Sequence, residues 1–117
     1  MNAALRSLFA LALGLGLSQA AIAGGNAEAG KAKAAQVCAA CHSADGTKPT
    51  TAEYPILAGQ YDEYLVRALS DYKSGKRKNP IMQGFAATLS AQDVQDVAAW
   101  FSSQGTSLYT PHEAEIR

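Results

Sequence analysis

Apolar side chains recur at helical spacing in two segments of the chain. In residues 60–74 they lie at positions i, i+3, i+4, i+7, i+8 and i+11, and they are Tyr61, Tyr64, Leu65, Ala68, Leu69 and Tyr72. The second segment follows Ser90, the expected N-cap residue, which has Asp93 three positions after it. Its apolar stripe consists of Val94, Val97, Ala98 and Phe101. Gly75 and Gly105 are the predicted stops of these two helices.

A third helix is predicted from composition over residues 26–37. This segment consists largely of strong helix formers, and Asn26 is its expected N-cap residue. The connections are marked by Gly and Pro, and no stretch alternates between apolar and polar residues as a strand would. The pattern therefore predicts an all-α fold with three main helices and two long connections. Connections of this length indicate a chain wrapped around a large group that the sequence does not encode.

Residues 1–23 have the order of a secretory signal peptide. Arg6 precedes an apolar run at residues 8–17, and small residues in the pattern AIA follow, so we expect cleavage after Ala23. The run is shorter than the ~20 residues of a spanning helix, and two glycines interrupt it. We therefore expect residues 24–117 to form one small exported domain in the periplasm, with no membrane span after cleavage. An uncleaved anchor is the alternative.

Charge and cysteine content restrict the function further. The 117 residues contain ten Lys and Arg against ten Asp and Glu, a balance that argues against a nucleic-acid binder. A domain this small has a marginal core and often depends on a disulfide, a metal or a cofactor. A disulfide between Cys38 and Cys41 would close a very short loop and contribute little stability. The two cysteines are therefore expected to carry chemistry or to hold a group.

The motif CAACH, residues 38–42, is compatible with three kinds of site. A thiol–disulfide oxidoreductase would need the motif at a helix start after a strand, whereas here it follows a predicted helix. A structural zinc site needs four ligands, and His112 is the only other His or Cys in the chain. Covalent haem attachment uses both thiols for thioether bonds and the following histidine, His42, as an iron ligand. Export, the helical pattern and the long connections favour haem.

Met82 is the candidate for the second axial position of such an iron. It is the one methionine besides Met1, and it lies in the segment NPIMQG, which we expect to be a loop. Thioether sulfur is a soft donor suited to low-valent iron, although packing in a core is the more common use of methionine. His112 is the competing ligand, and its position in the polar tail favours exposure to solvent. Ligation by His and Met fills both axial positions, which is typical of an electron carrier.

Residues 30–104 resemble the class I c-type cytochromes, and among them the monohaem cytochrome c4/c553-like group. The resemblance rests on GKAKAAQVCAACHSADG, YPILAGQYDEYLVRALSDYKSGKRKNPIMQGF and LSAQDVQDVAAWFSSQ. It implies that residues 24–117 are a cytochrome c domain with one haem c. The family pattern places a close crossing of the N-terminal and C-terminal helices at Gly30, with Phe101 or Trp100 approaching it.

The same resemblance implies a set of site residues. Cys38 and Cys41 would form the thioether bonds, and His42 and Met82 would be the axial ligands of the iron. The carbonyl group of Pro55 would accept a hydrogen bond from the His42 ring and so orient it. Candidates for hydrogen bonds to the haem propionates are Arg77, Asn79 and Trp100.

The predicted function is that of a periplasmic carrier of single electrons between larger redox proteins, and not that of an enzyme. We expect a monomer or weak dimer that binds a redox donor and acceptor and no nucleic acid. The basic run at residues 73–78 either steers an acidic partner or is an ordinary solvated loop. Two other functions are compatible with the residues: a haem enzyme or ligand sensor with a displaceable sixth ligand, and a cytochrome subunit of an oxidase or dehydrogenase complex.

Overall fold

The computed structural model describes residues 24–105, so the predicted signal peptide at 1–23 and the tail with His112 lie outside the described residues. The described part is all-helical and contains no strand, which confirms the predicted fold class. Its helices are α1 (Ala27–Val37), α2 (Ala39–His42), α3 (Asp62–Lys73), α4 (Pro80–Ala87) and α5 (Ala91–Ser102). The three predicted main helices correspond to α1, α3 and α5.

The predicted N-caps of α1 and α5 are confirmed. Oδ1 of Asn26 accepts hydrogen bonds from the backbone N–H groups of Glu28 and Ala29, each at 3.0 Å. At the start of α5, Oγ of Ser90 accepts from the Asp93 N–H at 3.0 Å, and Oδ2 of Asp93 accepts from the Ser90 N–H at 2.9 Å. This reciprocal pair satisfies N–H groups that a helix start otherwise leaves without partners.

Helix α4 was not predicted, and the expectation that Met82 lies in a loop is wrong. Oδ1 of Asn79 accepts hydrogen bonds from the N–H groups of Ile81 and Met82, each at 3.1 Å, and Asn79 is the N-cap of α4. Pro80 occupies the first turn, where its fixed φ suits a helix and its missing N–H costs nothing. Asn79 and Pro80, which were expected to lie in a loop, therefore begin a helix.

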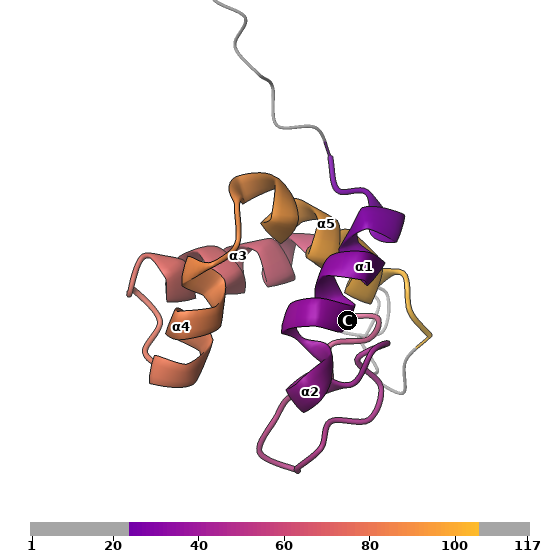
Figure 1. The fold of residues 1–117 in the computed structure, drawn as a ribbon, viewed down its shortest axis with the longest axis horizontal. Helices are drawn as coiled ribbons and strands as arrows, with labels where there is room; N and C mark the ends of the chain where they lie inside the picture. The colour runs from indigo at the N-terminus through magenta and orange to yellow at the C-terminus, as the bar shows by residue number, and fades with distance from the viewer. Residues whose placement is uncertain (1–23, 106–117) are drawn as a thin grey trace, which may run out of the picture.

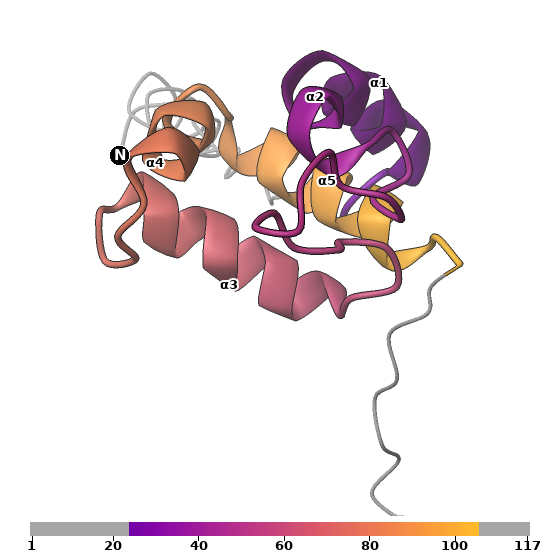
Figure 2. The same cartoon turned by 90° about the horizontal axis from the view of Figure 1, so that it is seen from below.

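The helices form two groups that meet at α5. Helix α1 crosses α5 and continues into α2, whereas α3 packs against both α4 and α5. Figures 1 and 2 show α1 and α2 towards one end of the domain and α3 and α4 towards the other. The buried core at the junction consists of Ala34, Leu65, Val97, Ala98 and Phe101. No helix within residues 24–105 has the length and apolar character needed to cross a membrane.

The crossing of α1 and α5 requires glycine, as predicted for Gly30. A Cβ atom at Gly30 would meet the backbone of Asp96 first and the Cβ of Trp100 at 3.0 Å. The approach of Trp100 agrees with the prediction, whereas Phe101 is not among the three nearest contacts. The absent side chain lets the two helices pack backbone to backbone.

Candidate haem-binding site

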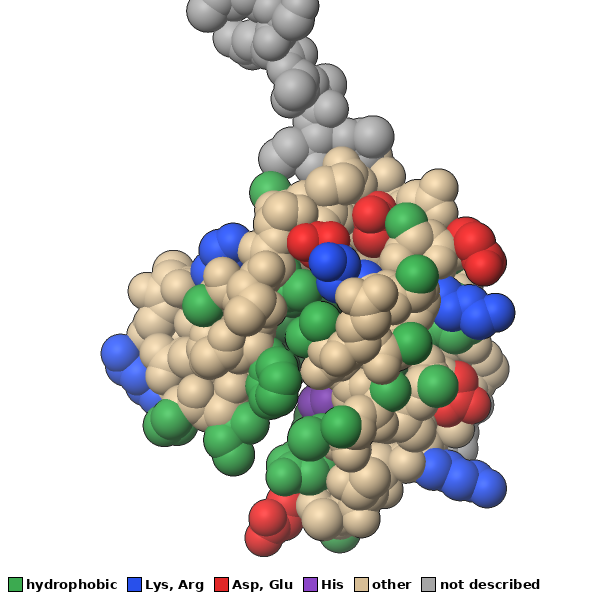
Figure 3. Space-filling model, viewed as in Figure 1, with side chains coloured by type: hydrophobic (Ala, Val, Ile, Leu, Met, Phe, Trp, Pro, Cys, Tyr) green, Lys and Arg blue, Asp and Glu red, His purple; other side chains and the backbone are tan. Residues whose placement is uncertain are grey.

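A cavity of about 370 Å³ lies between the two groups of helices, a volume within the range of protein sites for cofactors. All five helices, residues 53–57 and Gln60 contribute to its wall. Most of the lining is apolar or aromatic, and its members include Val37, Leu57, Leu65, Leu69, Phe85, Val97 and Phe101. Figure 3 shows this region as a cleft between hydrophobic side chains, with the histidine at its base.

The end of α1 and the single turn of α2 bring Cys38, Cys41 and His42 to the wall of this cavity. The N–H groups of Cys41 and His42 both lie within hydrogen-bonding distance of the Cys38 carbonyl, at 3.2 and 3.0 Å. This tight turn is what places three side chains so close in sequence on one surface. No disulfide joins the two cysteines, and burial raises the pKa of the Cys38 thiol to about 11.

His42 is buried, with only 6% of its surface exposed, and its ring has one defined hydrogen bond. Nδ1 lies 3.0 Å from the carbonyl oxygen of Pro55. Because a carbonyl oxygen only accepts, Nδ1 carries the proton, and Nε2 is the nitrogen with a lone pair for a metal. The ring of Tyr54 lies beside the imidazole, with 6.0 Å between ring centroids and an interplanar angle of 51°.

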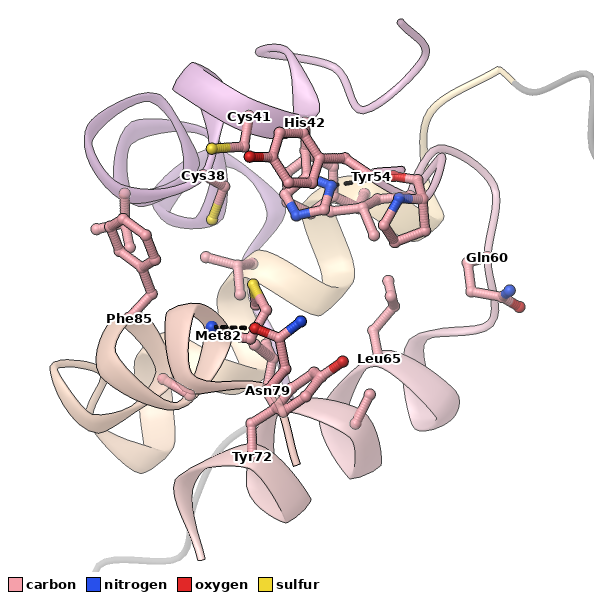
Figure 4. Close-up of a pocket in the computed structure, with 18 of the residues that line it drawn as sticks. Cys38, Cys41, His42, Tyr54, Gln60, Leu65, Tyr72, Asn79, Met82 and Phe85 are labelled. Atoms are coloured by element: carbon pink, nitrogen blue, oxygen red, sulfur yellow. Dashed lines mark hydrogen bonds between the residues drawn. The ribbon is translucent and has the colours of Figure 1, made fainter. Parts of the chain in front are cut away.

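Met82 reaches the same cavity from the opposite group of helices. The Asn79 cap begins α4, and the third residue of this helix, Met82, is half-buried in the cavity wall. Figure 4 shows its sulfur pointing into the cavity towards His42, with Cys38 and Cys41 beside the imidazole. The structure therefore brings together all four side chains that the sequence singled out, from segments that lie far apart along the chain.

This donor set fits haem c. Two thiols one turn apart can form two thioether bonds, while an imidazole nitrogen and a thioether sulfur are ligands that iron accepts in cytochromes. The apolar wall suits the faces of a porphyrin, and the orientation of His42 by Pro55 is the kind of support that ligating histidines receive. The chemistry of the cavity is thus that of a haem site.

The three candidates for hydrogen bonds to the propionates differ in their positions. Arg77 and Asn79 line the cavity, and the guanidinium of Arg77 donates to the Tyr64 hydroxyl at 3.4 Å. This hydrogen bond is the main reason why the pKa of Arg77 is raised. The indole N–H of Trp100 instead donates to the carbonyl oxygen of Ala44 at 2.9 Å. Trp100 therefore uses its donor within the fold, and its predicted contact with a propionate is not supported.

Three basic residues of the run at 73–78 have contacts within the fold. Nζ of Lys73 donates to the carbonyl oxygen of Leu89, and Nζ of Lys76 lies 3.9 Å from Oδ1 of Asp71. Arg77 lies over the ring of Tyr72, 4.9 Å from its centroid. All four basic residues of the run remain exposed, so the run is compatible both with a solvated loop and with a patch that steers an acidic partner.

Two features of the site were not predicted from the sequence. The Asn-Pro pair before Met82 is a helix-start signal, and reading it as such would have placed Met82 on α4. Tyr54, which packs beside His42, has no comparable signal, because a single tyrosine in a loop matches no pattern.

Comparison with known proteins agrees with this geometry. A family model described as cytochrome c matches residues 27–105. The chain is 50% identical over 101 residues to cytochrome c4 of Pseudomonas aeruginosa. This match covers 86% of this chain and 49% of that protein. It is 44% identical over 72 residues to a "thiosulfate dehydrogenase electron acceptor" of Stutzerimonas stutzeri, with 62% of this chain and 33% of that protein covered.

A solved structure is similar as well. Reduced recombinant cytochrome c4 from Pseudomonas stutzeri matches with a TM-score of 0.65 and 42% identity, over 77% of this chain and 51% of the other. The chain spans about half the length of the cytochromes c4 that it matches. A cytochrome c domain carries covalently attached haem c, and the motif at Cys38 and Cys41 fits one attachment. The chain belongs to the cytochrome c family.

Proposed function

We propose that this chain is a periplasmic carrier of single electrons, with one haem c bonded to Cys38 and Cys41 and ligated by His42 and Met82. The observation that carries the proposal is that His42 and Met82 extend into one apolar cavity from α2 and α4 and face one another (Figure 4). Export is supported by the signal-like pattern of residues 1–23, which would be removed after Ala23.

Each of these residues has a distinct task. Cys38 and Cys41 hold the group covalently, so that a small domain retains it without a deep pocket. Nε2 of His42 and Sδ of Met82 bind the iron, and the carbonyl of Pro55 keeps the imidazole in one tautomer and orientation. When bound, the haem supplies an iron that takes up and releases one electron.

The pair of axial side chains favours a carrier over an enzyme. If His42 and Met82 both ligated the iron, no position would be left for a substrate or for dioxygen. The buried side chains of Val97, Ala98 and Phe101 keep water away from one side of the cavity. A methionine ligand also raises the reduction potential relative to a second histidine.

The proposed partners are redox proteins, and the name of one relative supports this proposal. One relative is named as the electron acceptor of thiosulfate dehydrogenase, a name that describes an electron carrier serving a redox enzyme. For this chain we propose a redox protein as the donor and a second redox protein as the acceptor. The chain itself would act as a monomer or weak dimer.

The mass of the exported protein tests the attachment. From cells able to attach haem, we expect the polypeptide of residues 24–117 plus one haem, and a pyridine haemochrome spectrum typical of two thioether bonds. A mass equal to that of the bare polypeptide would contradict both the attachment and the proposed function.

Binding of carbon monoxide separates the carrier from a haem enzyme or sensor. A reduced protein with Met82 on the iron is expected to bind carbon monoxide slowly or not at all. Rapid binding would mean that the sixth position is open, and it would favour the enzyme or sensor.

A further inference from the structure

Ser43, the residue directly after His42, has a backbone conformation that residues with a side chain rarely adopt. Its φ is 67° and its ψ is 162°, and within residues 24–105 it alone combines a side chain with a positive φ. This region is essentially restricted to glycine, and another residue stays in it only where the surrounding structure holds it. Some set of contacts must therefore hold the backbone at Ser43.

The carboxylate of Asp45 is at the centre of those contacts. Its Oδ1 atom accepts hydrogen bonds from Oγ of Ser43 at 3.1 Å, from the Thr47 N–H at 3.0 Å and from the Thr47 hydroxyl at 2.7 Å. Oγ of Ser43 in turn accepts from the Lys48 N–H at 3.2 Å. The strained residue is thus tied through its own side chain to the turn that follows it.

This turn sends the loop back over α2 to the residues of the haem site. The N–H and the hydroxyl of Thr50 both donate to the carbonyl oxygen of Cys41, at 3.0 and 3.3 Å. Farther along the same loop, the carbonyl of Pro55 meets Nδ1 of His42 at 3.0 Å. The hydrogen bond that orients His42 therefore depends on the path that the chain takes after Ser43.

We propose that Asp45 is a positioning residue for His42. By holding Ser43 in its strained conformation, it keeps the Pro55 carbonyl against Nδ1 and the imidazole in a single orientation. The inference rests on the proposed function in that His42 is taken as an iron ligand. The alternative is that Asp45 only shapes an exposed turn, in which case its removal has no effect at the imidazole.

Exchange of the His42 Nδ1 proton with solvent, measured by NMR on the reduced haem-loaded protein, tests this role. Asp45→Ala removes the hydrogen bonds that Oδ1 accepts from Ser43 and Thr47 while the strain at Ser43 remains, so we expect exchange to become about tenfold faster or more. Ser43→Gly removes the strain, because glycine adopts this conformation freely. In the Ser43→Gly background, Asp45→Ala is expected to change the rate by less than about twofold.

Two references separate a local effect from general destabilisation. The amide of Val97, which is 1% exposed in the core, is expected to exchange at the wild-type rate in every variant. Ser74→Ala removes a similar exposed hydrogen bond, from Oγ of Ser74 to the Asp71 carbonyl, far from this loop. It is expected to leave the His42 proton unaffected.

Three results would overturn the proposal. They are an unchanged rate in Asp45→Ala, an equal acceleration in both backgrounds, and an acceleration shared by the Val97 amide. Failure of the proposed ligation gives a different result, namely a visible spectrum that His42→Ala does not alter. The proton exchange reports the hydrogen bond to Pro55 whichever group binds the iron.

Discussion

The backbone N–H of Asn26 donates a hydrogen bond of 2.7 Å to Oδ1 of Asp96, which fastens the start of α1 to α5. The same oxygen accepts from Nε2 of Gln92 at 2.9 Å. Asp96 is one of two buried polar or charged residues in the described part of the chain, and its exposed fraction is 8%. A carboxylate this deep in a small domain is stabilised by its hydrogen bonds.

Removal of this carboxylate is expected to weaken the fold. Asp96→Ala deprives the Asn26 N–H of its acceptor, and hydrogen bonds to a charged group contribute about 1.5–3 kcal/mol each. We expect the free energy of unfolding, measured in urea on the haem-loaded protein, to fall by roughly 2 kcal/mol. Asp96→Asn keeps an oxygen at the same place and should lose less. Equal losses in the two variants would contradict this account.

Gly30→Ala tests the helix crossing. The added Cβ would overlap the backbone oxygen of Asp96, a contact that only a movement of α1 or α5 can relieve. Overpacking of this kind costs about 1–3 kcal/mol, and thermal unfolding should show the loss. The matched control is Gly84→Ala in α4, where the new Cβ would have no atom within 4 Å beyond its chain neighbours and the local helix backbone. Because alanine favours a helix over glycine, that variant should gain up to about 1 kcal/mol.

The capping box of α5 predicts a dependence of stability on pH. Hydrogen bonds from the backbone and side chain of Ser90, and then the nearby Lys33, lower the pKa of Asp93 below its ordinary value of 3.8. The folded state therefore favours the ionised carboxylate. Its contribution to stability is fully present above pH 3.8 and is lost as pH falls through the folded pKa.

Asp93→Asn measures this contribution. At neutral pH we expect the free energy of unfolding in urea to fall by about 1 kcal/mol or less, since the side chain is partly exposed. The difference from the wild-type protein should shrink as pH is lowered below the ordinary range of aspartate. A difference that stayed constant down to acid unfolding would show that the charge of Asp93 is unimportant.

Met82→Ala tests the proposed sixth ligand. Alanine is a strong helix former, so α4 should persist while the sulfur is lost. We expect the spectral features of methionine ligation to disappear, carbon monoxide to bind rapidly and the reduction potential to fall. Gln83→Ala is the control, because Gln83 is the next residue on α4 and does not line the cavity. An unchanged spectrum in Met82→Ala would exclude Met82 as the ligand.

Much of this protein could be read from local sequence. The apolar stripes of α3 and α5, the caps at Asn26 and Ser90, and the contiguous CAACH motif are all set by residues within a few positions of one another. Helical periodicity and capping act over such short distances, so the pattern alone predicts the elements. It also placed both cysteines and His42 on one turn, because those residues are neighbours along the chain.

Short elements with ambiguous signals were less predictable. Asn79 and Pro80 occur in turns as readily as at helix starts, and α4 has too little amphipathic length to settle the choice. The positive φ of Ser43 could not be predicted from the sequence either, because a serine does not indicate such a conformation. Only the assembled loop, with Asp45, Thr47 and Lys48 in place, requires it.

The tertiary structure alone decided which distant residues meet. Asn26 and Asp96 lie 70 positions apart, Trp100 and Ala44 lie 56 apart, and each pair forms a specific hydrogen bond. A donor such as the Trp100 indole can serve a cofactor or the backbone, and the packing of α5 determines which. The sequence therefore specified the chemistry of the site and its helices. Their orientation around one cavity depends on contacts whose partners no local pattern identifies.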